Sequence, residues 1–359
     1  MDASHLLRRY RSALMGFAQL WIVLLHCWLL IIPNRPVLGA IEGFVKWNGT
    51  LGVEMFLFLS GIGMTYSIRK GTIRQFYLER LRRVLLPFWV MAAVNAIDAR
   101  LGVRWMLYYA TGLGSILENF QALLWFIPAI LILYMLFPAY HALMMRSKSR
   151  TRFTLAMLLL WLCAVILLRE TIREDLWVFI NRIPAFLVGA WFGEISRERT
   201  TILRGRHWAL CILVMLAGFS LRKAGLRGFF PWIPHFSFAV SWIISIPLCF
   251  LLAGLFSLLE TGKAGVVFRL PLRFLAFVGT FTLELYCCHQ WVFSKVYGLL
   301  EGHITYLGIN LVSMAAVIAA GWLFHAAHMR FWKRRAASFW PGIVKSFQRA
   351  KSICRKAFL

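Results

Sequence analysis

Five ionisable residues lie within long apolar stretches of this 359-residue chain, where a charged group is costly. They are His26, Glu54, Arg182, Glu284 and His289. A histidine can accept a proton from a hydroxyl group, and a neighbouring carboxylate can orient its ring. Two structural alternatives stay open: a buried His26 hydrogen-bonded to another helix, and an ion pair between Arg182 and a carboxylate. The pattern predicts a shared polar site for acid–base chemistry.

Two arginines, Arg80 and Arg83, lie three residues apart ahead of Pro87, so they share one face of a helix. Guanidinium groups bind phosphate oxygens in a planar, bidentate manner. We therefore expect them to bind a phosphate-containing ligand, although arginines that only set the membrane topology would show the same spacing. His325 and His328 have the same separation, but no third ligand is near them in the sequence, so no metal is expected.

The composition indicates an integral membrane protein. Hydrophobic residues make up 60% of the chain, charged residues only 15%, and the mean hydropathy is +0.70. Soluble domains carry roughly 25% charged residues. The net charge of +26 could suggest nucleic-acid binding, but the basic residues form short clusters between apolar runs rather than one polar patch. We therefore exclude nucleic acid as a partner and predict an all-α, polytopic membrane protein.

Ten apolar stretches are long enough, or nearly so, to span a membrane. They cover residues 13–32, 51–68, 84–97, 123–144, 153–168, 176–195, 207–221, 235–259, 272–295 and 304–329. The first is too long for the apolar core of a signal peptide, so we expect it to stay as a helix. Residues 1–329 would form the membrane domain, and the basic, aromatic-rich residues 330–359 a cytoplasmic tail at the lipid surface.

The orientation follows from the basic residues. Most of the 40 lysines and arginines fall in segments that ten spans would place on the same side as the N-terminus. The positive-inside rule then puts both termini in the cytoplasm. In this topology the five buried ionisable residues lie between the middle and the outer half of the membrane, whereas the segment with Arg80 and Arg83 faces the cytoplasm.

Several segments, in the same order along the chain, resemble motifs of the membrane family called acyltransferase 3. They are residues 16–26, 52–61, 76–87, 124–127, 134–138, 182–189 and 282–289. The first of them ends at the position of the family's functional histidine, here His26. Many members carry a basic residue eleven positions before this histidine, where this chain has Met15, and Arg11 lies one turn earlier.

The resemblance implies transfer of an acyl group, commonly acetyl, from coenzyme A to a hydroxyl group of a carbohydrate or related cell-surface molecule. The enzyme would lie in the bacterial inner membrane, use cytoplasmic acyl-CoA as co-substrate, and meet a carbohydrate or glycolipid acceptor on the outer side. Arg80 and Arg83 would bind the phosphates of coenzyme A. Arg182 and Tyr286 would contact substrate.

We expect His26 to be the general base that takes the proton from the acceptor hydroxyl group, because burial away from water keeps its ring neutral. Glu284 is the first candidate to orient the ring and Glu54 the second, both on the basis of depth alone. His289 is the next candidate for the base. A mechanism in which His26 itself carries the acyl group between two half-reactions also stays open.

A proton-coupled secondary transporter is the alternative function, because ten spans with buried charges would suit an exporter equally well. Transporters often contain inverted repeats with paired broken helices, and this sequence shows no repeat. The acyltransferase is therefore the preferred interpretation.

Overall fold

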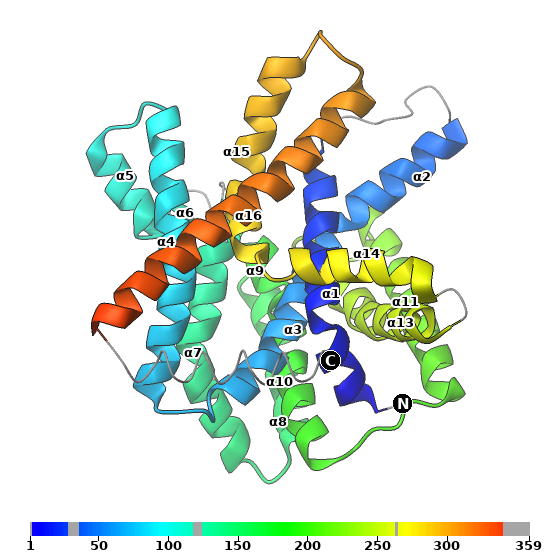
Figure 1. Ribbon diagram of the computed structural model, residues 1–359. Coiled ribbons are helices and arrows are strands. Elements are labelled where there is room, and N and C mark those ends of the chain that lie inside the picture. Colours follow the sequence, from blue (N-terminus) through cyan, green and yellow to red (C-terminus); the bar gives the residue numbers. More distant parts are fainter. Residues whose placement is uncertain (1, 28–35, 118–123, 263–264, 340–359) are drawn as a thin grey trace.

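The computed structural model describes residues 2–27, 36–117, 124–262 and 265–339, which fold almost entirely into helices (Figure 1). The α-helices are α1 (Ala3–His26), α2 (Pro36–Trp47), α3 (Leu51–Ser67), α4 (Ile73–Asp98), α5 (Val103–Ala110), α6 (Leu113–Leu117), α7 (Phe126–Arg146), α8 (Arg150–Leu167), α9 (Trp177–Ile180), α10 (Ile183–Glu198), α11 (Gly205–Leu226), α12 (Phe236–Ala239), α13 (Ser241–Thr261), α14 (Gly265–Val278), α15 (Thr282–Leu300) and α16 (Tyr306–Phe339). Two 3₁₀ helices, η1 (Asn48–Thr50) and η2 (Glu174–Leu176), precede α3 and α9. The described residues contain no strand, so the predicted all-α fold is confirmed.

By length and hydropathy, six of the described helical segments could each cross a membrane, or up to seven if one bent pair counts as a span. Each of the ten predicted stretches coincides with helix over most of its length, although residues 28–32 and 123 lie outside the described residues. The count of ten is not confirmed by this criterion, because α1 and α4 carry arginines and α3 has only 17 residues. The structure supports a multi-pass membrane protein.

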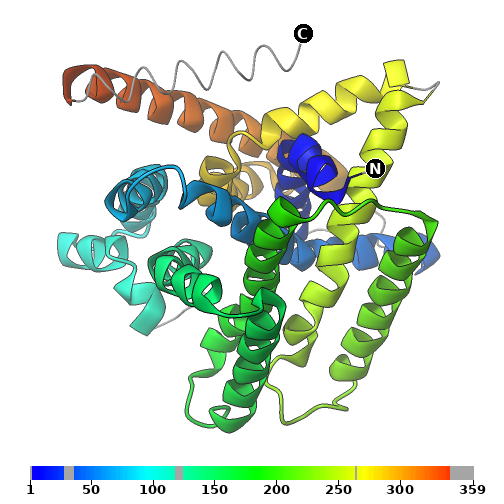
Figure 2. The same ribbon diagram turned by 90° about the horizontal axis from the view of Figure 1, so that it is seen from below.

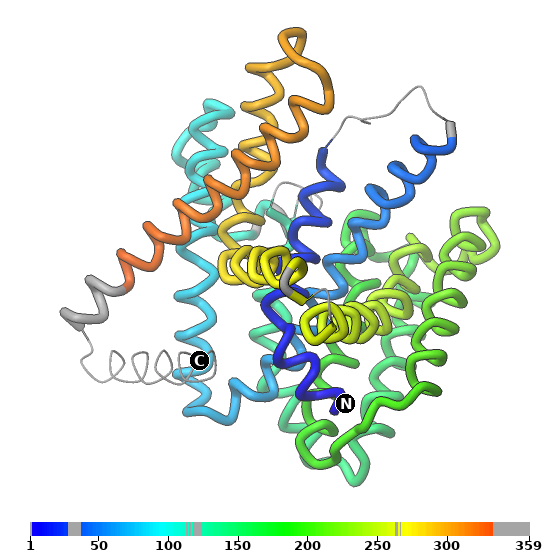
Figure 3. Tube along the Cα trace, turned by 45° about the vertical axis from the view of Figure 1, so that its right-hand side comes forward, coloured from blue at the N-terminus to red at the C-terminus, as the bar shows by residue number. Residues whose placement is uncertain are grey.

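One predicted span, residues 272–295, is not a single helix. The chain bends by 84° between Val267–Val278 and Thr282–Leu300. Gly279 lies at the break, and a Cβ there would be only 1.9 Å from the backbone oxygen of Ser12 in α1. Only glycine permits this close crossing of α14 over α1, which Figure 3 shows near the middle of the molecule.

The N-terminus and three basic loops lie at the same end of the molecule (Figure 1). Arg69, just after α3, forms an ion pair of 2.7 Å with Glu194 of α10. Arg150, at the start of α8, pairs with Glu198 at the end of α10. An isolated bridge joins Asp2 to the loop that follows α10. The proposed topology requires these four segments to share one side of the membrane.

Helix α1 connects this basic end to the candidate site. It runs through the middle of the molecule, with α4 and α7 on one side and α11 and α13 on the other (Figure 2). Its last residue, His26, packs against α15, so the site is assembled where α1, α3 and α15 come together with α7 and α10.

Candidate active site

His26 ends α1, and its ring faces α15. The ring centre lies 4.9 Å from that of His289, and Gln290 Nε2 lies 3.4 Å from His26 Nδ1. No carboxylate of the described residues is within ion-pair distance of His26. The polar neighbours of His26 are therefore His289 and Gln290 rather than a carboxylate.

His289 is almost fully buried, and its two ring nitrogens have different surroundings. Nδ1 lies 2.6 Å from the backbone oxygen of Tyr286, which can only accept a hydrogen bond, so Nδ1 carries the hydrogen. Nε2 is then the proton-accepting nitrogen. It is buried and has no hydrogen-bond partner in the part of the chain that the structure describes. A buried acceptor without a partner is costly, and a donor such as a hydroxyl group would satisfy it.

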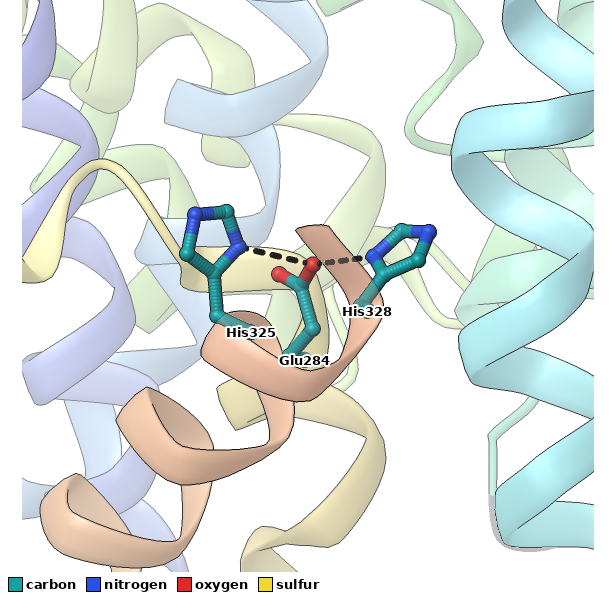
Figure 4. A group of neighbouring side chains, drawn as sticks. All are labelled: Glu284, His325 and His328. Carbon is teal, nitrogen blue, oxygen red and sulfur yellow. Dashed lines mark hydrogen bonds and ion pairs between the residues drawn. The ribbon is translucent and has the colours of Figure 1, made fainter. Parts of the chain in front are cut away.

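Glu284, the first candidate to orient His26, faces a different helix. Its Oε1 accepts hydrogen bonds from His325 Nδ1 at 2.9 Å and His328 Nδ1 at 2.7 Å, both on α16 (Figure 4). Five residues along an α-helix turn a side chain by about 140°, so Glu284 and His289 point to different neighbours. The structure therefore brings His26 together with His289 and does not bring Glu284 to it.

Glu54, the second candidate, forms a buried ion pair with Arg182. Arg182 Nε lies 2.8 Å from Glu54 Oε1, and the two side chains are 3% and 0% exposed. The guanidinium also lies 5.2 Å from the ring centre of Trp125 and 4.5 Å from that of Phe238. The structure thus shows the ion pair considered from the sequence. Glu54 Oε2 has no hydrogen-bond partner among the described residues.

Tyr286 lies between the histidines and this ion pair. Its hydroxyl group accepts a hydrogen bond of 3.2 Å from the backbone N–H of Phe126, and its ring centre is 5.4 Å from that of His289. Trp125, which covers the buried arginine, precedes Phe126 directly. Leu124 before them has a φ of +72°, which is strained for leucine and marks a tightly determined turn. This turn holds the rings of Trp125 and Phe126 between the histidines and the ion pair.

Arg80 and Arg83 lie in the first half of α4. The Arg80 guanidinium is 5.3 Å from the ring centre of Phe76 and 5.7 Å from that of Tyr134, and its Nε is buried without a hydrogen-bond partner. Arg83 is exposed. Within the described ranges neither arginine forms an ion pair, so both can bind an anionic ligand.

At the position of the family's basic residue, Met15 packs against the hydrophobic core. Arg11 lies one turn earlier beside α3, where a Cβ on Gly63 would be 3.3 Å from an Arg11 guanidinium nitrogen. The structure therefore places a guanidinium near, but not at, that position of α1.

Three residues of the site were not predicted from the sequence. Gln290 directly follows His289, the last residue of the motif at 282–289, so this motif could have indicated it. Trp125 and Phe238 contact Arg182 from segments far apart in the chain, and no periodicity in the sequence signals such a contact.

Comparisons with known proteins identify the family. A family model described as an acyltransferase domain matches residues 13–326, a range that contains His26, Glu54, Arg182 and His289. A search of curated proteins and a search of solved structures each found no match. The matched range covers most of the 359 residues and contains the histidine pair between α1 and α15. We conclude that this chain is a multi-pass membrane protein that belongs to the acyltransferase 3 family.

Proposed function

We propose that this acyltransferase moves an acyl group, in the simplest case acetyl, from cytoplasmic acyl-CoA to a hydroxyl group of a cell-surface carbohydrate or glycolipid. The observation that carries the proposal is that the rings of His26 and His289 meet between α1 and α15. One ring nitrogen, His289 Nε2, is a buried acceptor without a hydrogen-bond partner among the described residues. An attacking hydroxyl group must lose its proton, and a neutral histidine is suited to take it.

His26 acts as the general base in this proposal. The proton of the acceptor hydroxyl group passes to the His26 ring as the oxygen forms a bond to the thioester carbonyl carbon. The carbon–sulfur bond then breaks, and the sulfur takes the proton back from the imidazolium, which leaves the acylated acceptor and free coenzyme A. The ring centres are 4.9 Å apart, so rotation of the side chains would bring His289 Nε2 to the N–H of His26. In this proposal His289 takes the orienting role for which a carboxylate was expected.

The acyl donor would bind at the other end of the site. Coenzyme A carries several phosphate groups, and Arg80 and Arg83 project from the part of α4 that is nearest the basic end of the molecule. The proposal places this end in the cytoplasm of a bacterial inner membrane, where acyl-CoA is available. The acceptor would then reach His26 from the outer side, beside Tyr286 and Arg182.

Labelling of single cysteines introduced into a cysteine-free variant tests the ten-span topology. Cysteines at Ser147 and in the loop that contains Lys70 should react only when the inner face of the membrane is open to the reagent, because the basic residues hold these loops inside. A cysteine at exposed His303, between α15 and α16, should react in intact cells. Reaction of Ser147 and His303 variants from the same side would contradict the proposed topology.

Arg80→Ala and Arg83→Ala are expected to raise the apparent constant for acyl-CoA roughly ten- to a hundredfold, because each loses a charge-assisted contact to a phosphate. Lysine at either position should rescue only partly, since it lacks the planar fork. Arg74→Ala, an exposed arginine on the same helix, is the matched control and should leave the constant unchanged. Equal donor affinity in the double Arg80/Arg83 variant and the control would refute this assignment.

An assay with purified protein distinguishes the enzyme from a proton-coupled transporter. Incubation with labelled acetyl-CoA and a glycan acceptor should release free coenzyme A and label the acceptor in a manner that depends on His26. Movement of the acceptor across proteoliposomes without any release of coenzyme A would instead support the exporter.

A further inference from the structure

Three side chains that the proposed acyl transfer does not use form a compact cluster. Glu284 comes from the first turn of α15, and His325 and His328 come from successive turns of α16. Figure 4 shows the Glu284 carboxylate between the two imidazole rings. One potential ligand atom from each residue lies within 4.8 Å of the other two. The side chains of Glu284 and His328 are 6% and 4% exposed, and that of His325 is 26% exposed.

We propose that this cluster binds one divalent transition-metal ion of the zinc class. Two histidine nitrogens and one carboxylate oxygen are the donor set that zinc accepts in sites with three protein ligands and one open position. Ligand atoms around tetrahedral zinc lie roughly 3.3 Å apart, given metal–ligand bonds of about 2.0–2.2 Å. The two oxygen–nitrogen distances, 2.9 and 2.7 Å, are already close to that spacing. The sequence predicts no metal here, because no third ligand lies near His325 and His328 along the chain. The fold supplies that ligand, Glu284 from α15.

The positions of the ring hydrogens in the cluster determine which hydrogens have to move before a metal can bind. Trp332 Nε1 donates a hydrogen bond of 2.9 Å to His328 Nε2, so that nitrogen is an acceptor and the His328 hydrogen lies on Nδ1, facing Glu284. For the metal to bind Nδ1, this hydrogen has to move to Nε2, where it would face the Trp332 N–H. His325 has no such restriction, because its hydrogen can move to the nitrogen that points away from Glu284. Trp332 therefore opposes the metal-bound state.

The position of the cluster indicates a structural consequence of metal binding. The ion would join the start of α15, next to the bend after α14, to the C-terminal half of α16. The Arg82 guanidinium lies 5.7 Å from the Trp332 ring centre, so the cluster is adjacent to the segment of α4 that contains Arg80 and Arg83. The inference does not depend on acyl transfer, because it concerns metal binding alone.

Titration of the chelator-treated, tag-free full-length protein with Co²⁺ and Zn²⁺ tests the proposal. We expect one Co²⁺ per chain, with a visible absorption band of low-symmetry coordination that Zn²⁺ abolishes. Glu284→Gln and His325→Ala should weaken Zn²⁺ binding by at least about a hundredfold. His303→Ala, at an exposed histidine outside the cluster, is the matched control and should bind the metal normally.

Trp332→Phe gives the sharpest test, because a merely destabilised protein cannot produce its expected result. Removal of the indole N–H frees His328 Nε2 to carry the hydrogen, so Zn²⁺ should bind about three- to tenfold more tightly, the equivalent of one hydrogen bond. Absence of stoichiometric metal in the wild-type protein, or equal affinity in the Glu284→Gln variant, would overturn the proposal and leave a hydrogen-bonded clamp between α15 and α16. Weaker binding in Trp332→Phe would overturn the assignment of the His328 hydrogen to Nδ1.

Discussion

Replacement of His26 by alanine is expected to reduce acyl transfer by about 10²–10⁴-fold, the usual contribution of a general base. The loss should appear in turnover rather than in donor affinity, because Arg80 and Arg83 lie in α4 and do not contact His26. Turnover is measured as release of free coenzyme A in the presence of acceptor, and donor affinity by direct binding of a non-hydrolysable coenzyme A analogue. His26→Gln keeps a polar side chain of similar size without the basic nitrogen, so it should lose as much activity as His26→Ala.

The neighbouring histidine provides the internal comparison. His289→Ala removes the unpartnered acceptor nitrogen of the ring next to His26 but leaves the proposed base, so its loss should be smaller than that of His26→Ala. Rapid quenching with labelled acetyl-CoA and no acceptor reveals whether His26 itself carries the acyl group, since an acyl-enzyme would then accumulate. Near-normal transfer by a correctly inserted His26→Ala protein would exclude the proposed mechanism and move the role of base to His289.

The helices of this protein could be predicted from the sequence because a membrane span needs a continuous apolar stretch, and such stretches are visible without tertiary information. The bend between α14 and α15 was missed for a physical reason. The apolar stretch continues through Gly279, and only the close crossing over Ser12 of α1 shows why the chain has to turn there.

The members of the polar site could also be predicted, but their pairing could not. Depth in the membrane suggested that Glu284 and His26 belong together, yet depth says nothing about the direction in which a side chain leaves its helix. Glu284 faces α16, where His325 and His328 bind it, whereas His289 faces α1. Helical periodicity alone separates Glu284 from His289 by about 140°, so part of this arrangement was already contained in the sequence.

The ion pair between Glu54 and Arg182 leads to the second large effect. Arg182→Met is expected to lower the free energy of unfolding by about 3–5 kcal/mol, because it removes the guanidinium that is hydrogen-bonded to the buried carboxylate of Glu54. Glu54→Leu should have a similar effect, because it leaves the guanidinium unpaired. Arg222→Met is the comparison: this arginine also interacts electrostatically with Glu54, but it bonds directly to the neutral side chains of Asn48 and Thr50. Its loss leaves the hydrogen-bonded pair of Glu54 and Arg182 intact and should therefore cost less.

The double variant Glu54→Leu/Arg182→Met separates stability from function. It removes both charges together, so thermal unfolding in detergent should show a protein more stable than either single variant, since apolar replacement of a whole buried pair is often neutral. Acyl transfer should nevertheless stay low, because the guanidinium between Trp125 and Phe238 is proposed to contact substrate. Recovery of both stability and transfer in the double variant would show that the pair only holds α3 to α10. A double variant less stable than both single variants would show that the two charges do not stabilise each other.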